Sequence, residues 1–216
     1  MPKSSYVFAP KLEEYEKKFS EYLIMERKNG ILQVRMHTKG GPLKWSPRAH
    51  RAILEAWSMI GHDPENEVLI LTSTDPYWIG EADKEAFVEW DTTTDPDIRY
   101  DGLYRPIKSM QDFIFDINIP TIGVINGPGS VHWNFAVLSD ITLCAPNFVA
   151  RDDHFKMGHV PGDGMFLCLQ YLIGIKRANF VTYMSKNIDA KTALDWGIVN
   201  EVLPKEKLLP RAWEIA

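Results

Sequence analysis

Three short apolar runs, each bounded by polar or glycine-rich segments, constrain the fold of this chain more than any other feature. They are EVLILTS at 67–73, TIGVI at 121–125 and DITLCA at 140–145. A continuous apolar run of this length is typical of a strand that is covered on both faces. Helical patterns separate the runs, and crossover connections of this kind favour parallel pairing of the strands. We therefore predict an α/β fold.

The other predicted elements fit this pattern. Asn29-Gly30 lies between YLIMERK and ILQVRMH and predicts a hairpin over 21–37 with a type I′ turn. A helix is expected over 47–60, because Ser46 is a good N-cap and Pro47 suits the first helical position. Further helices are expected near 103–117, 133–138, 165–173, 176–185 and 189–196, and further strands at 147–151 and 198–203.

Composition and charge exclude several classes of protein. The net charge of -5 argues against a nucleic-acid surface, which needs a basic face. No apolar run reaches the roughly 18 residues of a membrane span. The N-terminus MPKSSYVFAPKLEEYEKKFS lacks the apolar core of a signal peptide, so the cytoplasm is the expected compartment. Cys144 and Cys168 stand in apolar surroundings and are expected to be reduced core residues.

Trp45 and His50 lie at the start of the helix predicted over 47–60. The i, i+3, i+4, i+7 spacing that is typical of a buried helix face occurs at His50, Ile53, Leu54 and Trp57. We therefore expect His50 to face the core. A buried histidine that hydrogen-bonds a backbone carbonyl also fits this pattern.

The segment INGPGSVHWNF at 125–135 places His132 where a glycine-rich turn meets the start of a helix. Ligands commonly bind at such strand ends in α/β sheets. An imidazole there can donate a hydrogen bond to a developing oxyanion, although a helix-capping histidine is the alternative. The loop at 74–87 follows the first apolar run, and its amides around Ile79 and Gly80 are a second candidate for an oxyanion site.

The segment ARDDHFKMGHVPGDG at 150–164 contains His154 and Asp163 in a glycine-rich loop. Because glycines let the chain fold back, the Asp163 carboxylate can reach one nitrogen of His154. A carboxylate in that position fixes the tautomer and makes the other nitrogen a better base. Asp152 and Asp153 are alternative partners for His154. His159 is nearer to Asp163 in sequence but equally fits a surface loop.

Taken together, these segments resemble the crotonase superfamily, the enoyl-CoA hydratase/isomerase fold, from about residue 22 to 216. The matching motifs are EVLILTSTDPYWIGEAD, IPTIGVINGPGSVHWNFAVLSDITLCA, FKMGHVPGDGMFLCLQYLIG and DAKTALDWGIVNEVLP. The resemblance implies a ClpP-like spiral of ββα units, with an N-terminal arm at 1–20 and a catalytic domain at 21–216. It also implies that the C-terminal helices, which drive trimer formation in the family, begin near 205 and are largely absent from this chain.

Two departures distinguish the chain from CoA-dependent members of the superfamily. The glycine run that usually follows the NG turn is replaced by a segment that contains His132. His154, four residues before Gly158, stands where hydratases commonly keep a glutamate, and Asp163 follows the PG pair. With Trp45 and His50, these substitutions resemble 6-oxocamphor hydrolase and related β-diketone hydrolases.

That resemblance implies an enzyme that needs no cofactor or metal and hydrolyses a C–C bond between the two carbonyls of a cyclic or bicyclic 1,3-diketone. This retro-Claisen cleavage gives a keto acid. In the implied mechanism His154 is the general base and Asp163 orients it. His132 and Trp45 hold the carbonyl or enolate oxygens, and His50 shapes the pocket.

Three alternatives remain open. The first is a CoA-thioester hydratase, isomerase or hydrolase of the same fold. The second is a metal-dependent hydrolase with His132, His154 and Asp163 as ligands, and the third is a non-catalytic member used for assembly. The expected partners are a small cyclic diketone and further copies of the chain, in a homotrimer or a dimer of trimers, with neither nucleic acid nor membrane.

Overall fold

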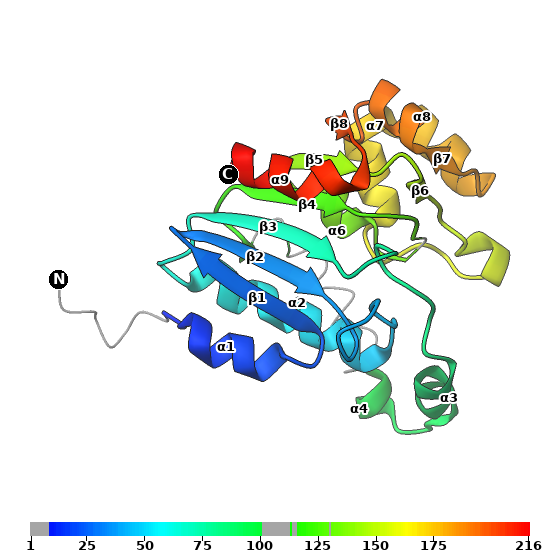
Figure 1. Ribbon diagram of the computed structural model, residues 1–216. Helices are drawn as coiled ribbons and strands as arrows, with labels where there is room; N and C mark the ends of the chain where they lie inside the picture. Colours follow the sequence, from blue (N-terminus) through cyan, green and yellow to red (C-terminus); the bar gives the residue numbers. More distant parts are fainter. Residues whose placement is uncertain (1–8, 101–112, 114–115, 130) are drawn as a thin grey trace.

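The computed structural model describes residues 9–100, 113, 116–129 and 131–216. At its centre is a six-stranded sheet of order β1-β2-β3-β4-β5-β8, with helices on both faces (Figure 1). β1 and β2 pair antiparallel, and the other neighbours in this sheet pair parallel. The predicted α/β class is therefore confirmed. Among the described residues, no helix has the length and apolarity needed to cross a membrane.

The strands of the main sheet are β1 Leu23–Lys28, β2 Ile31–Met36, β3 Val68–Ser73, β4 Thr121–Ile125, β5 Ile141–Cys144 and β8 Glu201–Val202. A separate antiparallel pair consists of β6 Val149–Ala150 and β7 Ile188–Asp189. The described helices are α1 Leu12–Phe19, α2 Pro47–His62, α3 Lys84–Thr92, α4 Pro96–Arg99, α6 Asn134–Val137, α7 Met165–Tyr183, α8 Ala190–Asp195 and α9 Lys205–Ile215. The helix predicted over 103–117 lies almost entirely outside the described residues.

Local sequence chemistry accounts for several of these boundaries. Asn29 and Gly30 join β1 to β2 with φ angles of 53° and 79°, in the left-handed region that these two residues tolerate best. α2 begins after Ser46, whose hydroxyl accepts a hydrogen bond from the Ala49 amide at 3.1 Å. The two helices predicted over 165–173 and 176–185 form α7, which is interrupted at Gly174 (φ 76°, ψ 156°).

The central strands separate two apolar layers, as the continuous apolar runs predict. In β3, Leu69 and Leu71 belong to the main core on the α2 side, whereas Ile70 belongs to a second cluster beneath α9. The second cluster consists of Ile70, Ile122, Val124, Leu143, Ala145, Leu208 and Ala212. Because successive side chains point to opposite faces of a sheet, each inner strand supports both layers. Cys144 and Cys168 are buried and free, as expected.

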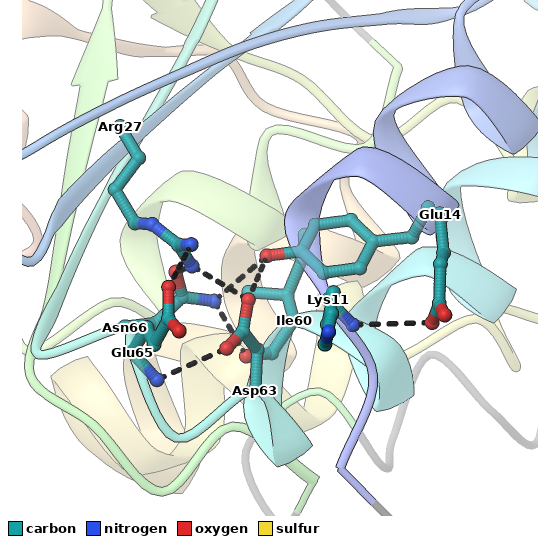
Figure 2. A network of polar contacts seen from close by, with 8 residues as sticks. Lys11, Glu14, Arg27, Ile60, Asp63, Glu65 and Asn66 are labelled. Carbon is teal, nitrogen blue, oxygen red and sulfur yellow. Dashed lines mark hydrogen bonds and ion pairs between the residues drawn. The ribbon is translucent and has the colours of Figure 1, made fainter.

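The segment at 1–20 contains α1, which packs against α2 through buried Tyr15. Figure 2 shows the polar network that fixes this packing, in which Arg27 of β1 reaches the carboxylate of Asp63 just after α2. The Arg27 Nη1 to Asp63 Oδ2 distance is 2.6 Å, and the Tyr15 hydroxyl donates to the same oxygen at 2.8 Å. The network therefore joins α1, β1 and the end of α2.

Candidate active site

The loops that follow β3 and β4 lie together at the carboxyl edge of the sheet. The Asn126 side-chain amide donates to Asp75 Oδ1 at 2.9 Å, and the Trp78 indole donates to the His132 carbonyl at 3.1 Å. A Cβ added at Gly127 would lie only 2.0 Å from the Pro76 carbonyl oxygen. Glycine at this position lets the two loops approach closely. This contact fixes the position of the loop that carries His132.

His132 lies inside a cluster of aromatic rings. Its ring centroid is 4.1 Å from that of Trp45, 5.2 Å from that of His50 and 5.3 Å from that of Phe135. His132 and His50 are 6% and 7% exposed, so both imidazoles are buried, as the helical spacing predicted for His50. The structure thus brings together three of the residues that the sequence proposed for the site: Trp45, His50 and His132.

The other two proposed residues, His154 and Asp163, reach the same cluster from the loop before α7. The Trp133 indole donates to the Arg151 carbonyl at 2.9 Å and fixes the start of this loop beside His132. Asp163 Oδ2 is 3.5 Å from His154 Nε2 and 3.8 Å from His132 Nδ1. Both distances are longer than an ordinary hydrogen bond. The carboxylate therefore lies between two imidazoles without being hydrogen-bonded to either.

The short contact of His154 is with Asp152, which the sequence offered only as an alternative partner. His154 Nδ1 lies 2.6 Å from Asp152 Oδ1, and the same oxygen accepts the His154 backbone N–H at 2.9 Å. Asp153, the other alternative, instead pairs with Arg151 at 2.5 Å and Lys156 at 3.1 Å.

The surroundings shift the pKa values of the three imidazoles in different directions. The hydrogen bond that His154 donates to Asp152 raises the pKa of His154, despite the opposing effect of burial. Burial lowers the pKa of His50 to about 4 and holds the pKa of His132 well below 6.5. Burial also raises the pKa of Asp163. At neutral pH, His50 and His132 are therefore neutral, and His154 is the most basic of the three rings.

Four buried polar atoms near His132 have no hydrogen-bond partner among the described residues. They are His50 Nε2, His132 Nδ1, and the side-chain nitrogen and oxygen of Asn134. Asn134 is fully buried, and a Cβ added at Gly164 would lie 3.7 Å from its Nδ2. Buried polar groups are normally hydrogen-bonded, so these atoms are available to a ligand. The sequence analysis missed Asn134, although an amide inside the apolar segment VHWNFAV was a signal.

The remaining candidates lie outside this cluster or are already hydrogen-bonded. The Gly80 amide donates to the Leu43 carbonyl at 2.8 Å, so it is not available to an oxyanion. Of the two candidate amides in this loop, that of Gly80 is therefore excluded. His159 is exposed. Within the part of the chain that the structure describes, no group of three His, Cys, Asp or Glu side chains is arranged to hold a metal ion.

The sequence profile of the enoyl-CoA hydratase/isomerase family matches residues 26–216. The chain belongs to this family. Carnitinyl-CoA dehydratase of Salmonella paratyphi A is 28% identical over 201 residues, which are 91% of this chain and 74% of that protein. Carnitinyl-CoA dehydratase of Citrobacter koseri is 34% identical over 104 residues, and the match covers 48% of this chain and 40% of that protein.

Solved structures of the family have the same architecture. ABDH, a β-diketone hydrolase from the cyanobacterium Anabaena sp. PCC 7120 solved with (S)-3-oxocyclohexyl acetic acid bound, superposes with a TM-score of 0.85 at 35% identity. The match covers 94% of this chain and 80% of that chain. An enoyl-CoA hydratase/isomerase from Mycobacterium paratuberculosis has a TM-score of 0.77 at 20% identity, covering 90% of this chain and 78% of that one. The predicted crotonase fold is confirmed.

Proposed function

We propose that this chain hydrolyses a C–C bond between the two carbonyls of a cyclic or bicyclic 1,3-diketone. The observation that carries the proposal is the position of the Asp163 carboxylate, 3.5 Å from His154 Nε2 and 3.8 Å from His132 Nδ1. This arrangement brings together His154 as a base, the carboxylate of Asp163 and the buried imidazole of His132, which can donate a hydrogen bond to a substrate oxygen. Similarity to a β-diketone hydrolase at 35% identity supports the proposal.

A small diketone suits the polar and apolar groups around His132. The apolar rings of Trp45 and Phe135 pack against His132, and a few buried polar atoms beside them have no partner among the described residues. Sites for small ligands are commonly built from such apolar side chains, with a few polar groups that fix the orientation of the ligand. A neutral His132 can donate one N–H to a carbonyl oxygen, and the amide of Asn134 offers a second donor for the other carbonyl.

The base in the proposed reaction is His154. Its side chain is 21% exposed, so water can approach it, whereas the rings of His50 and His132 are buried. His154 removes a proton from water, and the hydroxide adds to one carbonyl carbon. The electron pair of that C=O bond moves to oxygen, where His132 stabilises the new charge. Loss of one such donor in an oxyanion site typically slows turnover by about 100-fold to 1,000-fold.

Collapse of the tetrahedral intermediate breaks the C–C bond to the carbon between the carbonyls. The electron pair of that bond passes into the second carbonyl as an enolate, so no external electron sink is needed. Protonated His154 then returns its proton to the carbon. The net change is addition of one water to the diketone, giving a ketone and a carboxylic acid in the same molecule.

The acid bound to the Anabaena hydrolase suggests the first substrate to test. Joining its carboxyl carbon to the ring carbon next to the ketone, on the side away from the acid-bearing carbon, gives a bicyclic 1,3-diketone. The carbon between the two carbonyls is then a bridgehead. Such a diketone enolises poorly at that carbon, so both carbonyls stay open to attack by water.

The experiment is incubation of the protein with a panel of cyclic and bicyclic 1,3-diketones and of acyl-CoAs, with products identified by mass spectrometry. We expect keto acids from the diketones and loss of this activity in His154→Ala. His159→Ala is the matched control, because His159 is an exposed histidine of the same loop. Turnover of acyl-CoAs alone would replace the proposal with the CoA-thioester alternative, which the family and the carnitinyl-CoA dehydratases favour. Loss of diketone turnover on chelation would favour the metal-dependent alternative.

A further inference from the structure

We infer that Asp152, not Asp163, is the residue that positions the His154 ring, and that Asp163 instead faces the nitrogen that takes the proton from water. The inference rests on the proposed function for the role of His154 as base. It assigns two different tasks to the two carboxylates that flank one imidazole.

The hydrogen bonds of Asp152 support the positioning role. Its Oδ1 lies 2.6 Å from His154 Nδ1 and also accepts the backbone N–H of His154 at 2.9 Å. One oxygen thus holds both the ring and the main chain of the same residue. By contrast, Asp163 Oδ2 is 3.5 Å from Nε2, too far for a hydrogen bond of ordinary length.

These contacts also determine the tautomer of His154. An ionised carboxylate only accepts hydrogen bonds, so the proton of the neutral ring must be on Nδ1, next to Asp152. Nε2 then carries the lone pair and is the nitrogen that can act as base. The Asp152 side chain is only 2% exposed, whereas that of His154 is 21% exposed. The orienting carboxylate therefore lies behind the ring, away from solvent, where its hydrogen bond is strongest.

Asp163 lies on the reacting side of the ring. Its Oδ2 is close to both Nε2 of His154 and Nδ1 of His132 but bonded to neither. A water that donates one hydrogen to Nε2 can donate its second hydrogen to this oxygen, so both interactions orient the water for attack. The ionisable groups that face His154 are Asp152, Asp153, Asp163 and His132.

The test is ¹⁵N NMR of the His154 ring, followed as a function of pH in the wild-type chain and in three variants. In the wild type above its pKa, we expect the Nδ1–H tautomer. Asp152→Asn keeps an oxygen that can accept both hydrogen bonds but removes the charge. We expect it to lower the pKa of His154 more than Asp163→Asn does. Asp153→Asn is the matched control, because this neighbouring carboxylate pairs with Arg151 and Lys156.

Kinetics provide the second measurement. Asp152→Asn should lower kcat by roughly 100-fold or more, as loss of an orienting carboxylate does in a Ser-His-Asp triad, with little change in KM. The acid limb of its pH–rate profile should move to lower pH, whereas Asp153→Asn should move it less, because the charge of Asp153 raises the pKa of His154 by less than the hydrogen bond to Asp152 does. If Asp152 served only to stabilise the fold, a variant with native near-UV circular dichroism would keep the acid limb of the wild type.

The possible outcomes separate this inference from the proposed function. An Nε2–H tautomer in the wild type would overturn the inference, even if Asp152→Asn failed to fold. The inference would also be overturned if Asp163→Asn lost the Nδ1–H tautomer while Asp152→Asn kept it. If no diketone is hydrolysed but the NMR results are as expected, the proposed function fails while the positioning of His154 by Asp152 stands.

Discussion

Replacement of His50 by phenylalanine should make the free energy of unfolding less dependent on pH, by the equivalent of up to one bound proton. His50 is 7% exposed, its ring packs 4.9 Å from that of Trp45, and its Nε2 has no hydrogen-bond partner among the described residues. Burial in this cluster disfavours the charged imidazole and lowers its pKa from 6.5 to about 4. In the unfolded chain the same ring is exposed to water.

The magnitude follows from this difference in pKa. Between pH 6.5 and pH 4 the unfolded state binds a proton at His50 that the folded state does not, so stability falls as pH falls through this window. One full proton corresponds to about 1.4 kcal/mol per pH unit, and the shift of 2.5 units (6.5 minus 4) to about 3 kcal/mol in total. Above pH 6.5 this contribution is absent.

The assay is urea unfolding of the wild type and of His50→Phe at several pH values between 4 and 7.5. The slope of the unfolding free energy against pH should be smaller in the variant by up to about one proton. Packing strain from the larger ring shifts the whole curve but does not change its slope. His62→Gln is the control, since His62 is an exposed histidine of the same helix. Equal slopes in the wild type and His50→Phe would refute the reasoning that His50 is buried in its neutral form.

Three further predictions concern the base, the polar network and the loop contact. His154→Ala should lower kcat for diketone hydrolysis by about 100-fold to 10,000-fold, measured by keto-acid formation. Asp63→Ala should lower the unfolding free energy in urea by about 1–3 kcal/mol, because Arg27 loses its buried partner but keeps the exposed Glu65; an unchanged unfolding free energy would contradict this reading of the ion pair. Gly127→Ala should reduce both thermal stability and turnover, since its Cβ would meet the Pro76 carbonyl oxygen at 2.0 Å, and a variant with native melting temperature and kcat would disprove that constraint.

The parts of the fold that depend on local chemistry were predictable from the sequence. The apolar run TIGVI predicted β4 with its observed bounds, and Asn29-Gly30 predicted the turn between β1 and β2. Ser46 and Pro47 predicted the start of α2. Each of these signals acts over a few residues, through backbone preference or a single hydrogen bond. The small β6–β7 pair depends on contacts between distant segments, and only its β6 strand was predicted.

The candidate site was predictable in its residue types but not in its pairings. Spacing along α2 placed His50 on the buried face, because helix geometry alone decides that. Which carboxylate contacts His154 depends on backbone angles in an irregular loop, which no periodicity describes. Asp152 and Asp153 are neighbours, yet one reaches the ring and the other pairs with Arg151. Asn134 was missed because its importance follows only from the absence of a partner among the described residues.

His132 adopts a backbone φ of 47°, in the region where a residue with a side chain is less stable than glycine by about 1 kcal/mol. Folding alone would favour glycine here, so the imidazole is kept against the conformational preference of the chain. A relative with glycine at the matching position should have an equally well-formed turn and no hydrogen-bond donor from this position. The residue at this one position could therefore be used to sort members of the family by chemistry where overall similarity cannot.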